Sequence, residues 1–468
     1  MTPGRQPKRI FGTDGVRGTA NIEPVTAETA LKLGRAAAHV FKTLQSHARG
    51  RGKHRIVIGK DTRLSGYMIE NALSSGILSM GVDVMFIGPL PTPGVAYVTR
   101  SLRADAGIVI TASHNPYDDN GIKFFRADGY KLDELVEGRI EELVFSGAIE
   151  TIRPVASEVG KAIRIDDALG RYIEYAKSSF PKGMTLDGIR VVVDCANGAG
   201  YKSTPCVLRE LGAETIVIAN QPDGTNINRD CGSMHPENMC RKVVEHRAQL
   251  GIAHDGDADR VLLCDESGNL VDGDDILAIT GLEMLEENQL PEKTVVSTVM
   301  SNAGLDRALE EAGGRVVRTD VGDKNVIDEM LRGGYRLGGE QSGHMIFRDH
   351  ATTGDGLVAA LQILRIMKAR NALLSQLALC WTRFPQKLYN LRVRERRPFE
   401  SLDGVLDLLQ KAETELKKTG GRTLLRYSGT EPKVRLLLEG RDAEQLARLG
   451  EPIMERLSEL IGIQQGGA

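Results

Sequence analysis

Short apolar runs alternate with helix-like stretches along most of this chain, and this alternation constrains the fold more than any other feature. Between residues 55 and 111, apolar runs at 56–58, 82–87 and 106–110 are separated by helical stretches at 67–80 and 94–102. Strands that alternate with helices of this length are typical of β-α-β units, whose helices cover the faces of a sheet. The sequence therefore predicts an α/β fold.

The same rhythm returns twice further along the chain. It is seen at 191–193, 207–211 and 215–219, and again at 295–296, 303–312, 315–318 and 323–331. Three successive units predict three related β-α-β domains with mixed sheets. A chain of 468 residues is also too long for a single core.

The order of elements changes after Trp381. Strand-like segments at 387–393, 423–427 and 434–438 alternate with amphipathic helical segments at 402–418 and 443–460. This order predicts a smaller α+β domain at the C-terminus. We place the four domains at 1–158, 159–268, 269–382 and 383–468, and we expect the charged stretch near Arg394 to act as a hinge.

Composition excludes several classes of function. Lys and Arg total 60 and Asp and Glu total 63, so the net charge of −3 gives no general attraction for nucleic acid or acidic membranes. The apolar runs fall far short of the ~20 residues of a membrane helix, and the N-terminus lacks the apolar core of a secretory signal. We expect a cytoplasmic protein; whether it forms a homodimer is left open. The six cysteines include no Cys-x-x-Cys pair, and we assign no zinc.

One hydroxyl stands out in the loop that follows the apolar run 106–110. Ser113 is placed at the carboxyl end of the predicted strand, where α/β enzymes position reactive groups. His114 is its neighbour, but adjacent side chains of an extended chain point to opposite sides, so the two cannot form a serine-protease triad by themselves. The alternative is a loop serine that bonds nearby backbone groups.

Three carboxylates follow the apolar run 250–253 at alternate positions: Asp255, Asp257 and Asp259. At an effective dielectric of about 20, two charges ~4 Å apart repel by about 4 kcal/mol, and a bound cation removes that cost. Oxygen ligands at a strand end favour Mg²⁺. An EF-hand is excluded because Arg260 stands where its turn requires glycine. Solvated surface acids are the alternative.

Two further polar loops suggest ligands. Residues 338–344 combine glycines with a carboxylate, an amide, a hydroxyl and an imidazole, which suits a sugar. Residues 426–435 offer arginines, hydroxyls and glycine amides, which suit a phosphate. Each could equally be an ordinary polar turn. A Walker loop at 197–203 is excluded because Tyr201 replaces the glycine before its lysine, so we expect no nucleotide binding.

Together these loops resemble those of the α-D-phosphohexomutase superfamily, and most closely those of the bacterial phosphoglucosamine mutases. The resemblance spans nearly the whole chain and includes FGTDGVRG at 11–18, GKDTR at 59–63 and TGDG at 353–356. It implies an isomerase that carries phosphate on Ser113 and exchanges it with a sugar phosphate. The expected reaction converts glucosamine 6-phosphate to glucosamine 1-phosphate through a 1,6-bisphosphate, for amino-sugar nucleotide synthesis. Glucose 1,6-bisphosphate could serve as activator.

The resemblance also implies a role for each matching residue. One Mg²⁺ per chain is held by phosphorylated Ser113 with the three aspartates. Groups near the transferring phosphate are Arg17, Lys123 and His344, with His114 either shaping the loop or contacting phosphate. Sugar hydroxyls are held by Glu340 and Ser342, and the distal phosphate by Arg426, Ser428, Gly429, Thr430 and Arg435.

Two positions depart from the family pattern. Lys324 stands where relatives often have arginine, and Thr111 replaces a frequent serine. The open alternatives are a phosphoglucomutase or phosphomannomutase that uses the same machinery, and a non-catalytic sugar-phosphate-binding protein.

Overall fold

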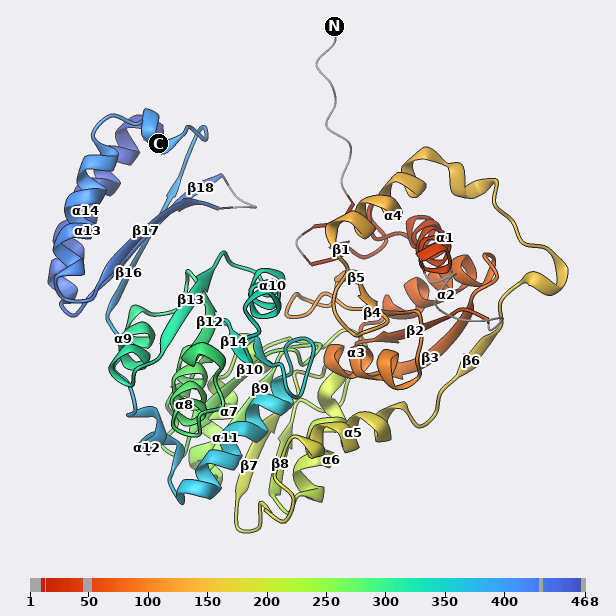
Figure 1. Ribbon diagram of the computed structural model, residues 1–468, viewed down its shortest axis with the longest axis horizontal. Coiled ribbons are helices and arrows are strands. Elements are labelled where there is room, and N and C mark those ends of the chain that lie inside the picture. Colours follow the sequence, from red (N-terminus) through yellow and green to blue (C-terminus); the bar gives the residue numbers. More distant parts are fainter. Residues whose placement is uncertain (1–9, 13, 45–52, 429–431, 464–468) are drawn as a thin grey trace, which may run out of the picture.

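The computed structural model describes residues 10–12, 14–44, 53–428 and 432–463 (Figure 1). Its first sheet has the order β1-β5-β4-β2-β3-β6. The strands are β1 (Val16–Thr19), β2 (Arg55–Lys60), β3 (Asp83–Pro89), β4 (Ala106–Ile110), β5 (Asp119–Arg126) and β6 (Ala162–Arg164). The helices are α1 (Ala27–Leu44), α2 (Gly66–Leu78), α3 (Thr92–Ser101), α4 (Glu134–Ser146) and α5 (Ala168–Ser178).

Strand β2 shows why this sheet is covered on both faces. Its residues alternate in direction, so Ile56 and Ile58 join the apolar core under α1, α2 and α4, while Val57 joins the core under α3 and α5. All three side chains are buried. A continuous apolar run in the sequence thus corresponds to a strand enclosed between two helical layers.

The second and third sheets repeat this plan. The second has the order β11-β10-β9-β7-β8, and the third has the order β13-β12-β14-β15. The second contains β7 (Arg190–Asp194), β8 (Glu214–Ile218), β9 (Leu250–His254), β10 (Val261–Asp265) and β11 (Leu270–Val271), with helices α6 (Ser203–Glu210) and α7 (Glu237–His246). The third contains β12 (Thr294–Thr298), β13 (Arg315–Thr319), β14 (Leu337–Gly339) and β15 (Met345–Phe347), with α8 (Gly273–Glu286), α9 (Ala303–Glu311), α10 (Asp323–Gly333), α11 (Gly356–Arg370) and α12 (Leu374–Ala378).

Each of these three sheets combines parallel and antiparallel pairing. β2 pairs in parallel with β3 and β4, whereas β4 pairs antiparallel with β5; β9 with β10 and β14 with β15 are the corresponding antiparallel pairs. One apolar core runs through all three units and includes Val95 of α3, Leu208 of α6 and Leu361 of α11. The prediction of related α/β units with mixed sheets is confirmed.

The C-terminal part is a smaller unit with a core of its own. Strands β16 (Gln386–Arg392), β18 (Lys433–Glu439) and β17 (Arg422–Tyr427) form an antiparallel sheet in that order, which packs against α13 (Val405–Lys417) and α14 (Ala443–Ile461). In Figure 1 this blue unit lies next to β13 and α9, across the view from the first sheet. Arg422 joins it to the third unit by donating to the carbonyls of Val299 and Ser301.

The hinge expected near Arg394 is wrong. The backbone N–H of Arg394 donates to the carbonyl of Ile461, and its guanidinium donates to the carbonyl of Leu460, both at the end of α14. The charged stretch therefore belongs to the body of the C-terminal unit, and the connection to the third unit lies earlier, between α12 and β16. Among the described residues, no helix is both long and apolar enough to cross a lipid bilayer.

Candidate active site

Three site loops occupy the same position in three sheets. The loops that follow β4, β9 and β14 each connect a strand of the parallel part to the antiparallel strand beside it, β5, β10 or β15. These loops carry Ser113, the three aspartates and Glu340 respectively. The carboxyl ends of the central strands in three separate sheets therefore carry the candidate residues predicted from the sequence.

Ser113 is directed at the aspartates of the second unit. It is buried, its φ of 52° lies in the left-handed region, and its Oγ donates to Oδ2 of Asp255 at 2.6 Å. Nδ1 of His114 lies 3.4 Å from the same Oγ. The serine hydroxyl thus faces a carboxylate across a domain boundary, which a loop serine bonded only to nearby backbone would not do.

The three aspartates converge as a metal site requires. One oxygen from each of Asp255, Asp257 and Asp259 lies within 4.8 Å of the others, and all three residues are buried. Oδ1 of Asp257 and Oδ1 of Asp259 have no hydrogen-bond partner within the described part of the chain. Two orphaned carboxylate oxygens in a buried cluster fit a hard cation, and the alternative of solvated surface acids is wrong.

Burial and repulsion set the ionisation of this cluster. Burial, together with the charges of Asp257 and Asp259, raises the pKa of Asp255 well above its usual value. Burial alone would also raise the pKa of Asp259, but the nearby Lys123 and His344 lower it overall. A divalent cation would allow all three carboxylates to ionise together.

Lys123 lies on β5 and reaches into the cluster. Its Nζ is 3.1 Å from Oδ2 of Asp257, 3.7 Å from Oδ2 of Asp259 and 3.0 Å from Oδ2 of Asp14. Burial lowers the pKa of Lys123, but the three carboxylates outweigh that effect and raise it. Lys123 is therefore a buried cation within the aspartate cluster.

His344 approaches the cluster from the third unit. Its Nδ1 lies 3.7 Å from Oδ1 of Asp259, and its Nε2 accepts a hydrogen bond from the backbone N–H of Gly354 at 3.1 Å. Burial opposes protonation, but Asp259 and Asp323 raise the pKa of the imidazole above its ordinary value. The accepted bond at Nε2 places the proton of the neutral ring on Nδ1, facing Asp259.

The pKa of His114 is shifted in the opposite direction to that of His344. Nδ1 of His114 lies 3.1 Å from Nη1 of Arg260. Burial, with further contributions from Arg260 and Arg17, lowers its pKa to about 4. The neutral form of His114 is therefore favoured near neutral pH, and in this form one ring nitrogen can accept a hydrogen bond.

Arg17 belongs to an ion-pair network that the sequence did not reveal. Its guanidinium pairs with Asp14, which also pairs with Lys131. Lys131 pairs in turn with Asp323 of α10, so the network joins the first and third units. Asp14 lies within the 11–18 motif, but Lys131 and Asp323 gave no comparable signal.

The loop 338–344, predicted to bind a sugar and called the sugar loop below, buries only one of its two candidate sugar-binding residues. Glu340 is buried, and its Oε1 accepts from the backbone N–H of Gly322 at 3.1 Å, whereas Ser342 is exposed. Lys324 lies 3.6 Å from Glu137 of α4. The positive charge of Lys324, which stands where relatives often have arginine, thus lies against a carboxylate of the first unit.

The segment 426–435, predicted to bind a phosphate, brings two arginines to opposite positions. Arg426 of β17 and Arg435 of β18 are directly opposite residues of the antiparallel pair. Burial and the charge of Arg435 both lower the pKa of Arg426. Like charges at such positions are unfavourable, and an anion between them removes the repulsion. Ser428 is buried beside them, while Gly429 and Thr430 lie outside the described residues.

Sequence comparison identifies the family. Sequence models of phosphoglucomutase/phosphomannomutase alpha/beta/alpha domains I, II and III match residues 8–150, 170–268 and 272–384, and that of the C-terminal domain matches residues 388–456. The chain belongs to the phosphoglucomutase/phosphomannomutase family. Family members with high identity to it are phosphoglucosamine mutases. That of Geotalea uraniireducens is 57% identical over 460 residues, covering 98% of this chain and 100% of the relative, and that of Syntrophotalea carbinolica is 57% identical over 457 residues, covering 98% and 99%.

Solved structures of the family share the fold. A phosphoglucomutase/phosphomannomutase family protein from Burkholderia thailandensis superposes with a TM-score of 0.79 at 25% identity, covering 98% of both chains. The N-acetylphosphoglucosamine mutase of Aspergillus fumigatus, solved with GlcNAc-6P and magnesium, gives a TM-score of 0.67 at 17% identity and covers 96% of this chain and 95% of its own. The second likeness shows the fold alone.

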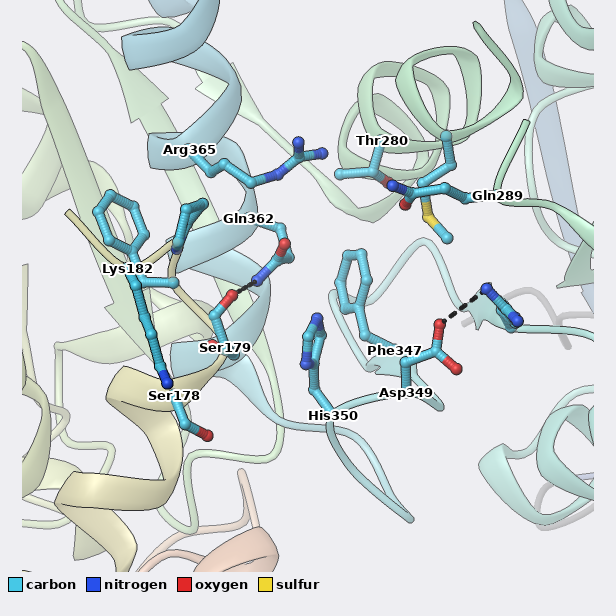
Figure 2. Close-up of a pocket in the computed structure, with 14 residues that line it drawn as sticks. Ser178, Ser179, Lys182, Thr280, Gln289, Phe347, Asp349, His350, Gln362 and Arg365 are labelled. Atoms are coloured by element: carbon cyan, nitrogen blue, oxygen red, sulfur yellow. Dashed lines mark hydrogen bonds and ion pairs between the residues drawn. The ribbon is translucent and has the colours of Figure 1, made fainter. Parts of the chain in front are cut away.

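A separate cavity of about 500 Å³ is not part of this site (Figure 2). It lies between the end of α5 and helices α8 and α11, and its lining includes none of the predicted site residues. Its arginines are already paired, Arg336 with Asp349 at 3.5 Å and Arg365 with Glu287 at 3.0 Å. The candidate active site therefore lies at the ends of β4, β9 and β14, outside this cavity.

Proposed function

We propose that this chain is a phosphoglucosamine mutase that interconverts glucosamine 6-phosphate and glucosamine 1-phosphate. The observation that carries the proposal is the hydroxyl of Ser113, aimed at Asp255 from 2.6 Å within a buried cluster of carboxylates and one lysine. The identity of the substrate is supported by relatives named phosphoglucosamine mutases, which are 57% identical over nearly the whole chain. The product would feed synthesis of amino-sugar nucleotides.

The proposed reaction begins with phosphate carried on Ser113. The phosphoryl group passes from Oγ of Ser113 to the C1 hydroxyl of glucosamine 6-phosphate. That hydroxyl loses its proton to a protein base, and Oγ of Ser113 takes up a proton from a protein acid as the Oγ–P bond breaks. The resulting 1,6-bisphosphate turns around, and its 6-phosphoryl group passes back to Ser113. The Ser113 hydroxyl then loses its proton, O6 of the sugar gains one, and glucosamine 1-phosphate is released. No phosphate is gained or lost in the cycle, which makes the overall reaction an isomerisation.

One Mg²⁺ would be held by Asp255, Asp257 and Asp259 together with the phosphate on Ser113. When bound, it would stabilise the negative charge of the transferring phosphoryl group. The protein supplies further positive charge from Lys123 and Arg17. We assign proton transfer to Lys123 and His344, which lie 3.7 Å from opposite oxygens of the Asp259 carboxylate. General acid and base groups of this kind contribute about 10²–10⁴-fold. His114, as a neutral acceptor, would orient the loop.

The rest of the substrate would be held by the third and fourth units. Glu340 and Ser342 would bind sugar hydroxyls. The arginine pair at 426 and 435, with Ser428, Gly429 and Thr430, would bind whichever phosphate is not reacting. We accordingly assign the phosphoserine loop to residues 1–158, the metal loop to 159–268, the sugar loop to 269–382 and the distal phosphate to 383–468.

A coupled assay tests the proposal and its alternatives together. The purified protein is given glucosamine 6-phosphate, glucose 1-phosphate or mannose 1-phosphate in turn, with Mg²⁺ and a trace of glucose 1,6-bisphosphate. We expect the highest kcat/KM for glucosamine 6-phosphate. A preference for glucose or mannose phosphate would indicate a phosphoglucomutase or phosphomannomutase, and binding without turnover would indicate a non-catalytic protein.

A further inference from the structure

Arg63 donates hydrogen bonds to the backbone of residues 111–119, called the serine loop below. Its side chain is fully buried just after β2. One terminal nitrogen, Nη2, donates to the carbonyls of Ser113 at 2.9 Å and Asn115 at 2.8 Å. The other, Nη1, donates to the carbonyl of Asp119 at 3.1 Å and to that of Pro116. A single guanidinium thus holds four carbonyl oxygens of one loop.

The orientation of Arg63 is itself fixed. Its Nε donates to Oδ2 of Asp61 at 2.9 Å, and its backbone N–H donates to Oδ1 of the same carboxylate at 2.9 Å. The flanking residues join the segment to the second unit, because Thr62 donates to the carbonyl of Asn197 and the N–H of Leu64 donates to the carbonyl of Gly224. The segment that holds the serine loop is therefore also hydrogen-bonded to the second unit.

A second donor, from the second unit, binds two of the same carbonyls. Nδ2 of Asn228, a residue of the second unit, donates to the carbonyls of Ser113 at 2.8 Å and Asn115 at 3.0 Å. The carbonyl of Ser113 is consequently held by Arg63 of its own unit and by Asn228 of the unit that carries the aspartates. Neither side chain touches the reacting hydroxyl.

The conformation of Ser113 makes such support necessary. A residue with a side chain is strained at its φ of 52°, and strained conformations persist only where surrounding contacts impose them. We propose that Arg63 and Asn228 are positioning residues, which hold the Ser113 loop in this conformation and in register with the aspartate loop. The inference rests on the proposed function, because its purpose is in-line phosphoryl transfer from Ser113.

The test uses variants that change donors while leaving the reacting groups in place. Asn228→Asp keeps the size of the side chain but replaces the donating amide by an acceptor, and Arg63→Lys keeps the charge but cannot span four carbonyls. Arg35→Ala is the matched control: Arg35 is a buried arginine of the same unit whose guanidinium donates to the carbonyls of Ile149 and Ile152, in a different loop. Thermal stability, kcat, KM and amide hydrogen exchange of residues 111–119 are measured for each protein.

We expect kcat to fall by roughly 10²-fold in both positioning variants, with KM unchanged, since small misplacements of a reacting group have effects of that size. Amide exchange in residues 111–119 should accelerate in these variants and not in Arg35→Ala. The inference is overturned if Asn228→Asp and Arg63→Lys retain the parent's exchange rates, or if Arg35→Ala loses as much kcat at equal stability. A parent protein without mutase activity would refute the proposed function instead, and the exchange measurement would still decide whether the two residues hold the loop.

Discussion

At the residue scale, the molecule places like charges together where a ligand is expected. The aspartate cluster is buried, and Oδ1 of Asp257 has no partner among the described residues, while Oδ2 accepts from Thr92 at 2.7 Å and from Lys123. Folding alone would favour fewer charges at such a position. A bound cation would offset the repulsion among these carboxylates.

Replacing Asp257 with Asn should therefore weaken metal binding without unfolding the protein. One of three anionic ligands is lost, so the Mg²⁺ concentration needed for half-maximal activity should rise about 10–100-fold or more. Added Mg²⁺ should raise the Tm of the parent much more than that of the variant. Asp265→Asn is the control, because Asp265 is buried at the other end of β10 and outside the cluster. If EDTA left the parent fully active, the cluster would have a structural role only.

A different buried carboxyl predicts how stability depends on pH. Burial, with repulsion from Asp272, raises the pKa of Asp274 in the first turn of α8 to about 7. The unfolded chain releases this proton near pH 4, so between pH 4 and pH 7 the folded state binds more protons than the unfolded state. The contribution of Asp274 to stability is therefore complete below pH 4 and is lost as pH rises through 7, by an amount on the order of 4 kcal/mol.

Asp274→Asn removes this dependence, while its side-chain oxygen can still accept from the N–H of Asn302. Relative to the parent, the variant should become more stable as the pH rises from 5 to 7 in denaturant titrations, and the difference should level off above pH 7. A stability difference that stays constant over this range would mean that Asp274 ionises normally in the folded state.

At the element scale, the repeated strand–loop–return strand explains what the sequence could predict. The strands β2, β4 and β7 are short apolar runs, and they were located because burial on both faces leaves a local apolar signal. The return strand β5 was missed because it carries Asn120 and Lys123, which are buried only through polar partners in other segments. Helix α11 was missed because residues on nearly all its sides are buried, which leaves no amphipathic period.

The candidate site was likewise predicted only in part from the sequence. Ser113 and the three aspartates follow strands that were recognised, and their convergence follows from the topology of α/β sheets. The network of Lys131 and Asp323, and the grip of Arg63 on four carbonyls, depend on contacts across 50 to 192 residues of sequence. No pattern within a single segment encodes such contacts.

The C-terminal hairpin yields a prediction at this scale. Arg426→Gln should raise the KM for glucosamine 6-phosphate by roughly 10–100-fold, because a charge-assisted hydrogen bond to phosphate contributes about 1.5–3 kcal/mol. The Tm without substrate should not fall, since the change also removes repulsion from Arg435. Arg448→Ala on the outer face of α14 serves as control. An unchanged KM, together with no increase in released 1,6-bisphosphate, would indicate that the distal phosphate binds elsewhere.

At the scale of the whole molecule, one apolar core runs through the first three units, and the fourth has a core of its own. The continuous core of the first three units fixes the serine loop, the aspartate loop and the sugar loop relative to one another. The C-terminal unit, with Leu436 and Leu438 in a separate core, meets the third unit through contacts such as those of Arg422. A separate C-terminal core would suit the proposed reaction, in which the bisphosphate intermediate turns around.

The central claim is that Ser113 is the phosphoryl donor, and the direct measurement combines intact mass with turnover for the parent and Ser113→Ala. After incubation with glucose 1,6-bisphosphate and Mg²⁺, the parent should gain the mass of one phosphoryl group, and glucosamine 6-phosphate should remove that group in a single turnover. Ser113→Ala should fold, gain no mass and show no detectable turnover, because its side chain loses only the hydroxyl bonded to Asp255. Turnover by Ser113→Ala at the parent's rate, or a parent that is active without ever carrying phosphate, would contradict the account.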